Sequence, residues 1–451
     1  MKSPSLNVLP LFAALALSAA AQTNTPAPWP SQPLTLHEAL EITLRQSPLI
    51  LKAKQDVEES YGLALELRSA IRPRLTAGGA YQAIASDSIE TPPGSTMRFQ
   101  NDQSWNANIL VNQPVFAGGK LRSRVRSGDL TEEAALAQFQ ALVADAVLEV
   151  KVNYDDVLLA AEQIKTQEAS VALLEQELTD QKRRYDAGTA PRFNVLRAEV
   201  ELANARPKLI RAQNLFRITK NNLATRLGWD IPTNTTENIP LELADRLEAR
   251  PFDLSLPVAI ARGIEQRPEL AARKTDVRLR REGVKQAQAD YYPTVGITGG
   301  YQWRSTIFRD DLSINYDGWL AGAQVNWTIW DFGATRGRVK AAKARLERSE
   351  VVVSDTSRQI ELEVRTAYSN FIEAQQVLES QEKVIEQAEE AVRLAMARND
   401  AGSGTQLDVL SAQTALTDAR TTQSIALRDY AVALARLERA IGEGARLTAP
   451  R

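Results

Sequence analysis

The chain has 451 residues, with 54 lysines and arginines against 56 aspartates and glutamates, a single histidine and no cysteine. The balanced charge argues against a nucleic-acid-binding surface, and the lack of cysteine excludes disulfides and a lipid-acceptor thiol. His37 alone cannot assemble a zinc cluster. No Gly-rich phosphate loop is present, and the acidic residues share helical faces with basic ones. We therefore expect no cofactor, no metal, no nucleic-acid partner and no enzymatic activity.

The N-terminus resembles an export signal. Residues 1–21 combine Lys2, an apolar run from Val8 to Leu17 and a small-residue site at Ala19-Ala20-Ala21, which predicts a cleaved signal peptide. A membrane anchor is the weaker alternative, because the apolar run is shorter than the ~20 residues that span a bilayer. Residues 22–34 are rich in proline and are expected to be extended.

The first large unit is predicted over residues 35–228. Thr35 and Glu38 form a capping box that begins a helix, and Pro48 should break or kink it. After Pro73 the apolar period changes from about 3.6 to 2, which predicts strands at about 74–84 and 104–116. A long helical hairpin at about 120–228 follows and turns at Gly188, where glycine can adopt the left-handed conformation.

The second unit, residues 256–442, repeats the first. The motif Tyr185–Gly188 recurs as Asn399–Gly402 at an offset of 214 (402 − 188), and upstream residues match at an offset of 220. The repeat predicts strands at about 294–304 and 318–330 and a hairpin at about 336–442 with its tip at residue 402. Residues 229–255 form the linker, and residues 443–451 form a C-terminal tail.

The four predicted strands alternate apolar and polar residues over about ten positions, the length of tilted membrane-spanning strands. Five of the seven tryptophans lie in them, as expected for an aromatic girdle at the membrane surface. A soluble β-sandwich would alternate similarly, so the alternation favours a membrane only modestly. The girdle candidates are Trp105, Trp303, Trp319, Trp327 and Trp330.

Four strands in one chain cannot close a wall in lipid, because open edges would leave backbone groups unpaired. Three chains would supply twelve strands, enough for a water-filled bore, and the long helices with heptad seams would pack beside one another in a second cylinder. The sequence therefore predicts an α+β membrane protein with a duplicated helix–strand–strand–long helical hairpin unit. Its trimer would form a 12-stranded β-barrel, four strands per chain, continuous with a long α-helical barrel.

The paired tips, residues 185–189 and 399–403, the Asn194-Val195-Leu196 and Asp408-Val409-Leu410 segments, and the duplicated strand pairs resemble the TolC-like outer-membrane efflux proteins over nearly the whole mature chain. The resemblance implies the exit duct of a tripartite efflux system in the outer membrane of a Gram-negative-type cell, with the helical barrel in the periplasm. Its partners would be two further copies of the chain, a periplasmic membrane-fusion adaptor, an inner-membrane pump and outer-membrane lipid.

Two sets of candidate residues follow from the resemblance. The tips would dock the adaptor, although the same residues could merely form the hairpin turns. Asp408 matches a constricting aspartate of the family, although it could equally be a helix N-terminal charge; three such carboxylates near an axis would attract cations and raise one another's pKa. The docking candidates are Arg184, Tyr185, Asp186, Gly188, Thr189, Arg398, Asn399, Asp400, Gly402 and Ser403. The gate candidates are Asp408, Ser411, Asn194 and Arg197. The last three depart from the family's pattern: Ser411 stands at its second acidic position, and Asn194 and Arg197 stand at the equivalent places of the first half, so the gate is expected to be looser or to use other contacts.

Two other functions remain open. A type I protein secretion channel would share this architecture and differ in its partners, and a periplasmic coiled-coil scaffold without a pore would need the strands to close as a sandwich. The sequence reveals neither the exported substrate, nor the pump family, nor the contacts that close the periplasmic end, nor a role for Pro207.

Overall fold

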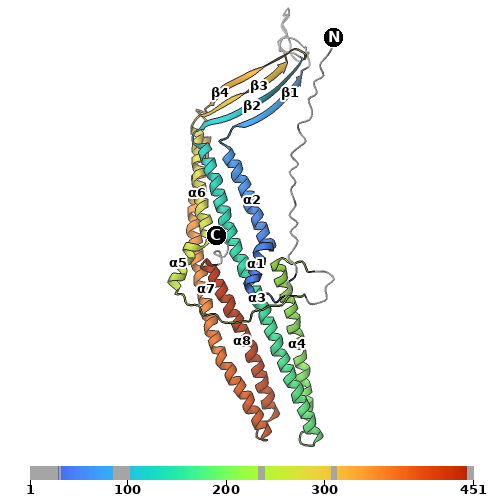
Figure 1. Cartoon of the computed structure of the whole chain (residues 1–451). Helices are drawn as coiled ribbons and strands as arrows, with labels where there is room; N and C mark the ends of the chain where they lie inside the picture. Colours follow the sequence, from blue (N-terminus) through green and yellow to red (C-terminus); the bar gives the residue numbers. More distant parts are fainter. Residues whose placement is uncertain (1–28, 30–31, 85–101, 232–238, 306–311, 444–451) are drawn as a thin grey trace, which may run out of the picture.

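The computed structural model describes residues 29, 32–84, 102–231, 239–305 and 312–443. The expected signal peptide, most of residues 22–34 and most of the tail lie outside these residues. The chain is elongated, with a sheet at one end and two hairpin tips at the other (Figure 1). The elements are α1 (Leu36–Gln46), α2 (Pro48–Ser69), β1 (Arg74–Ala83), β2 (Gln103–Ala117), α3 (Lys120–Asp186), α4 (Arg192–Leu227), α5 (Leu256–Gln266), α6 (Pro268–Gln288), η2 (Ala289–Tyr291), β3 (Thr294–Ser305), β4 (Asn315–Asn326), α7 (Ala334–Asp400) and α8 (Gln406–Ala440).

The two halves of the chain have the same order of helices and strands. The expected capping box of Thr35 and Glu38 begins α1, and the helix ends just before Pro48, which opens α2. In the second half, α5 and α6 meet in the same way at Pro268. α4 continues through Pro207, although proline cannot donate the helical hydrogen bond at that position.

The strands form one antiparallel sheet in the order β1-β2-β3-β4. Within the described chain, the outer edges of β1 and β4 have no strand partner. Helices α2, α3, α6 and α7 lie side by side in the same lateral order below the sheet. The sheet edge formed by β1 therefore lies on the flank of α2, and the edge formed by β4 lies on the flank of α7 (Figure 1).

Where the sheet meets the helices, one predicted strand differs from the structure. The expected strand at about 318–330 is observed as β4, which ends at Asn326, so Trp327 and Trp330 follow the strand instead of lying in it. Thr294, the first residue of β3, pairs with Asn326. The residues before β3 form the η2 turn, so β4 has no partner beyond Asn326 even though its alternating pattern continues.

The apolar core lies at mid-length, where the short helices pack on the long hairpins. In the first half, Val150 and Tyr154 of α3 pack with Leu223 of α4 and with residues 239–241 of the linker. The second half repeats this cluster with Val364, Phe371 and Leu437. Among the described residues, no helix is both apolar enough and long enough to cross a membrane.

Candidate functional site

The hairpin tips are built by two matching helix ends. Gly188 and Gly402 both have a φ of 72°, the expected left-handed conformation. After Gly188, the Thr189 amide donates to the Arg184 carbonyl, and after Gly402 the Ser403 amide donates to the Arg398 carbonyl. These bonds satisfy carbonyls left open at the ends of α3 and α7, so both tips have the same defined turn.

One ion pair joins the two tips. Arg184 Nη2 lies 2.9 Å from Asp400 Oδ1, and both side chains are largely exposed. Tyr185, Asp186 and Asn399 also lie on the end surface of the molecule. The structure thus brings the ten docking candidates together at one end, where another protein could reach them.

Asp408, the main gate candidate, caps the start of α8. Its carboxylate accepts hydrogen bonds from the backbone and hydroxyl of Thr405, and its own amide donates to the Thr405 hydroxyl. Hydrogen bonds from the Thr405 backbone and then its hydroxyl hold the pKa of Asp408 below its usual value. Asp408 is exposed, so its charge faces solvent at the N-terminal end of a helix, where a negative charge is favoured.

The other gate candidates lie one helical turn beyond Asp408 or at the equivalent start of α4. Ser411 is exposed, and Arg197 is half-buried. Gln406 of α8 lies against the start of α4, with its Nε2 atom 3.4 Å from the Asn194 carbonyl and 3.4 Å from Glu177 Oε1. The starts of the two returning helices are therefore adjacent within one chain.

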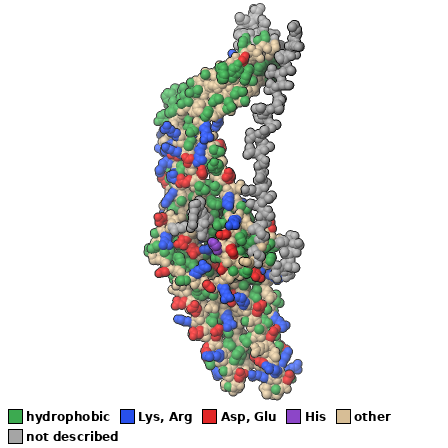
Figure 2. Space-filling model, viewed as in Figure 1, with side chains coloured by type: hydrophobic (Ala, Val, Ile, Leu, Met, Phe, Trp, Pro, Cys, Tyr) green, Lys and Arg blue, Asp and Glu red, His purple; other side chains and the backbone are tan. Residues whose placement is uncertain are grey.

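The two faces of the sheet differ in polarity. Strand register places Tyr81, Trp105, Ile109, Tyr301 and Trp319 on one apolar face. On the other face, Asn112 accepts a 2.8 Å hydrogen bond from Thr298 and lies 3.4 Å from the hydroxyl of Thr76. Hydrophobic side chains gather over the sheet in Figure 2, whereas charged side chains cover the helices.

The five tryptophan candidates fall at the two ends of the sheet. Trp105, Trp303 and Trp319 lie near the end of the sheet that points away from the helices. Trp327 and Trp330 lie at the helical end and are mostly exposed. From Trp319 to Trp327 an extended chain covers about 27 Å, so the tryptophans form two groups, one near each end of the sheet.

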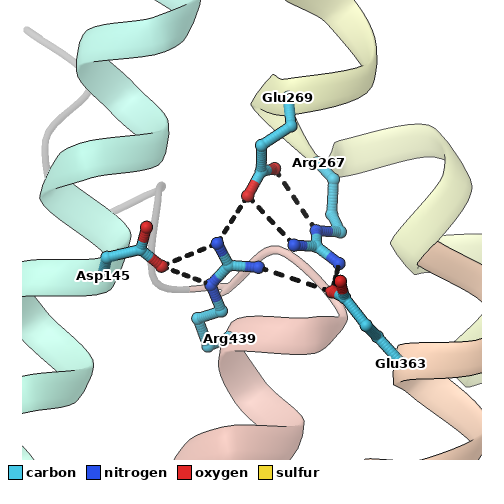
Figure 3. Close-up of polar contacts among 5 residues, drawn as sticks. All are labelled: Asp145, Arg267, Glu269, Glu363 and Arg439. Carbon is cyan, nitrogen blue, oxygen red and sulfur yellow. Dashed lines mark hydrogen bonds and ion pairs between the residues drawn. The ribbon is translucent and has the colours of Figure 1, made fainter. Parts of the chain in front are cut away.

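Sequence reasoning missed a charged cluster at mid-length (Figure 3). Arg439 of α8 contacts Asp145 of α3 and Glu269 of α6, each at 2.6 Å, and lies 3.8 Å from Glu363 of α7. The side chain of Arg267 is 4% exposed and pairs with Glu269 and Glu363. One sequence signal could have found this cluster, because neither arginine is repeated in the first half of the chain. Ser47 stands at the position equivalent to Arg267, and Thr225 stands at the position equivalent to Arg439.

A second missed group lies where α3, α8 and the linker enclose a cavity of about 450 Å³. Lys151 pairs with Glu438 at 2.6 Å, and Asp156 pairs with Arg428 at 2.6 Å. Asp155 lines the cavity together with Lys151 and Glu438. Burial and then the neighbouring charge of Asp156 raise the pKa of Asp155 to about 7.

Comparison with known proteins identifies the family of this chain. The sequence model described as "Outer membrane efflux protein" matches residues 39–229 and 259–443. The outer membrane protein TolC of Vibrio cholerae is 24% identical over 96% of this chain and 95% of its own length. The alkaline protease secretion protein AprF of Pseudomonas aeruginosa is 25% identical over 90% of this chain and 83% of its own length.

Solved structures show the same fold. The Campylobacter jejuni CmeC outer membrane channel superposes with a TM-score of 0.77 at 16% identity, covering 91% of this chain and 86% of that one. The family match spans both halves of the repeat, from α1 to the end of α8. The chain belongs to the outer membrane efflux protein family.

Proposed function

We propose that the chain is the exit duct of a tripartite efflux system and conducts substrates passively across the outer membrane. The observation that carries this proposal is the sheet. Within the described ranges its two outer edges have no strand partner, one of its faces is apolar and the other carries polar residues, and it continues into long helical hairpins. Membership of the outer membrane efflux family supports the same conclusion. In this role the protein is a channel and not a catalyst.

The assembly would be a homotrimer. Pairing of β4 with β1 of the next copy removes both free edges, and three copies close a 12-stranded barrel with its apolar face toward lipid. The two tryptophan groups would then lie at the two membrane surfaces. The hairpins would form an α-helical barrel in the periplasm, and the protein would have no lipid anchor because it lacks cysteine.

The tips would receive the partners. A periplasmic membrane-fusion adaptor would contact the exposed residues around Gly188 and Gly402 and connect the duct to an inner-membrane pump, which supplies the energy. Asp408 of three copies would form a ring of negative charge that favours cations, with Ser411, Asn194 and Arg197 lining the neighbouring surface. Because the Thr405 bonds favour ionised Asp408, this ring would stay charged unless the three carboxylates come close together.

The direct test is assembly and conductance. We expect the purified protein to fractionate with the outer membrane, to have the mass of a trimer in detergent and to form ion channels in planar bilayers. A stable, water-soluble monomer without ion flux would refute the proposal and would favour a periplasmic scaffold.

Type I protein secretion is the second candidate. The observation in its favour is the similarity to AprF, whose name describes protease secretion. Co-purification separates the two functions: an efflux duct should bring down a resistance-type pump with its adaptor, whereas a secretion duct should bring down an ATP-driven exporter.

A further inference from the structure

Charge changes sign along the long helices with distance from the sheet. At the start of α3, residues 120–128 contain four lysines and arginines and no acid, whereas residues 129–150 contain five acids and neither lysine nor arginine. At the start of α7, residues 334–346 contain five lysines and arginines and no acid. The part of each long helix next to the sheet is therefore strongly basic.

These cations do not stabilise the helices that carry them. The first turn of a helix favours negative charge, yet neither α3 nor α7 has an acid in its first turn. Arg122 and Arg336 are exposed at the third position of their helices, where their charge opposes the helix dipole. Their position therefore needs an explanation outside the helix.

Five of the cations form two matching rows, which we call the basic collar. Arg122 and Arg126 are four residues apart on α3, and Arg336, Lys340 and Lys343 are spaced by four and three residues on α7. Residues at this spacing lie on one side of a helix. The offset of 214 relates the two rows (336 − 122; 340 − 126), so the same side of both helices is basic.

The collar is open to solvent. On α3 the neighbouring helices contact other residues, since Ser123 bonds to Glu282 of α6 at 2.8 Å and Gly128 packs closely on Ala64 of α2. All five collar residues are exposed. Arg126 lies 3.9 Å from Glu282, whereas the other four have no ion-pair partner among the residues that the structure describes.

Aromatic residues mark the depth at which the collar begins. Trp327 and Trp330 lie at the helical end of the sheet, as do Tyr291 and Tyr292, and all four are at least half-exposed. Tryptophan and tyrosine gather at the headgroup level of membranes. Arg336 follows Trp330 by six residues, and Figure 2 shows lysine and arginine side chains directly below the hydrophobic sheet. The collar thus begins where the apolar surface ends.

We propose that the basic collar binds the phosphate groups of anionic phospholipids in the leaflet that faces the periplasm. This inference rests on the proposed function, which places the apolar sheet in the outer membrane and the helices in the periplasm. Clusters of lysine and arginine next to a membrane-embedded segment bind anionic lipid headgroups. Their attraction falls off over a Debye length of about 8–10 Å, the rise of about six helical residues, and both rows begin within that distance of the sheet.

The repetition of the rows favours lipid over an acidic protein partner. Two rows in each of three chains would give six basic rows around the duct. A lipid leaflet surrounds the duct and meets all six. The proposed adaptor contacts lie at the other end of the hairpins, around Gly188 and Gly402.

Lipid selectivity of the purified trimer tests this proposal. The collar variant combines Arg122→Gln, Arg336→Gln and Lys340→Gln. Native mass spectrometry counts the phosphatidylglycerol and phosphatidylcholine molecules, of equal chain length, that stay bound. The wild type should retain more phosphatidylglycerol. The collar variant should lose this preference by at least about tenfold, because one basic residue near an anionic surface contributes roughly fivefold.

The control variant removes three exposed arginines farther along α7, by Arg358→Gln, Arg365→Gln and Arg393→Gln. It loses the same charge as the collar variant and should keep the preference of the wild type. Inorganic phosphate distinguishes a lipid site from a site for the free ion. Compared with chloride at equal ionic strength, it should not displace phosphatidylglycerol.

Several results would overturn the lipid site in a trimer that still conducts ions, and these would leave the proposed function intact. They are equal retention of the two lipids by the wild type, an unchanged preference in the collar variant, equal losses in the collar and control variants, displacement by inorganic phosphate, or retention of an acidic protein in place of lipid. A monomer without ion flux would instead refute the proposed function itself.

Discussion

Arg184 of the first hairpin and Asp400 of the second form an ion pair of 2.9 Å, which joins the two tips of one chain. The pair links the last turns of α3 and α7. Any movement that separates the hairpins at their tips must break it. Gln406 of α8 also contacts Glu177 of α3 and Asn194 of α4 near the tips, so the ion pair is one of the side-chain contacts that join the two hairpins there.

Asp400→Asn should therefore loosen the tips. Exposed ion pairs contribute about 0.2–1 kcal/mol, so the equilibrium between open and closed tips should shift by at most about fivefold. Single-channel recordings in planar bilayers should show more frequent opening at low salt, and the difference should shrink at high salt because salt screens exposed charges.

The matched control is Asp180→Asn. Asp180 pairs with Arg183 in the same helix, so this change removes a nearby carboxylate without breaking a contact between the hairpins. If both variants behave alike, then overall charge explains the effect and the Arg184–Asp400 pair does not hold the tips.

Much of this architecture could be predicted from local sequence signals. Gly188 and Gly402 marked the tips, and the change of apolar period after Pro73 marked the strands, because both signals depend on neighbouring residues only. The end of β4 could not be predicted in this way. Trp327 and Trp330 continue the alternating pattern, but a strand also needs a partner, and β3 begins opposite Asn326.

The residues of the candidate site also divide into those that local sequence signals predict and those that they do not. Residues at the tips were predictable because the repeat placed them there. The contacts of Arg267 and Arg439 were not, because their four helices meet only in the folded chain (Figure 3). Their departure from the repeat showed that they were unusual without showing their partners.

The charge of Asp408 can be separated from its role as a helix cap. Asp408→Ala should weaken the cation preference of the channel at neutral pH, because it removes the carboxylate. Thr405→Ala should keep that preference at neutral pH, because it removes only the hydroxyl that bonds to the carboxylate. Reversal potentials in asymmetric KCl measure both effects, and unchanged selectivity in Asp408→Ala would remove this residue from the gate.

The cation preference of the wild type and of Thr405→Ala should also differ at acid pH. The Thr405 bonds lower the pKa of Asp408 in the folded protein, so the carboxylate stays ionised to a lower pH than it would without them. The wild type should accordingly keep its cation preference to a lower pH than Thr405→Ala. The backbone bond from Thr405 remains in both proteins, so an identical acid midpoint would show that the Thr405 hydroxyl does not lower the pKa of Asp408.

The mid-length cluster should depend on its buried arginine. Arg267→Met leaves Glu269 and Glu363 without that partner and should cost on the order of 3 kcal/mol of folding free energy. Glu363→Gln should cost less than about 1 kcal/mol, because the Glu363 side chain is 55% exposed. Thermal unfolding in detergent should rank the variants in this order, and equal losses would mean that burial does not decide the contribution.

The raised pKa of Asp155 should make folding stability depend on pH. With a pKa of about 7 in the folded protein against the ordinary 3.8, the folded state binds more protons than the unfolded state between these values. Stability from this group should therefore fall as the pH rises from about 4 to 7. Asp155→Asn should flatten that part of the pH profile, whereas Asp180→Asn, which changes a partly exposed carboxylate in the same helix, should leave it unchanged.

The tip glycines should respond to substitution in the opposite way from a helical glycine. Gly188→Ala and Gly402→Ala place a Cβ on a backbone with a φ of 72° and should each cost about 1 kcal/mol. Gly283→Ala in α6 has open space and should instead stabilise its helix by a similar amount. Unfolding temperatures of the three variants provide the comparison. If valine at both tips left folding and export intact, the left-handed turns would not be required for either, because β-branched residues strongly resist positive φ.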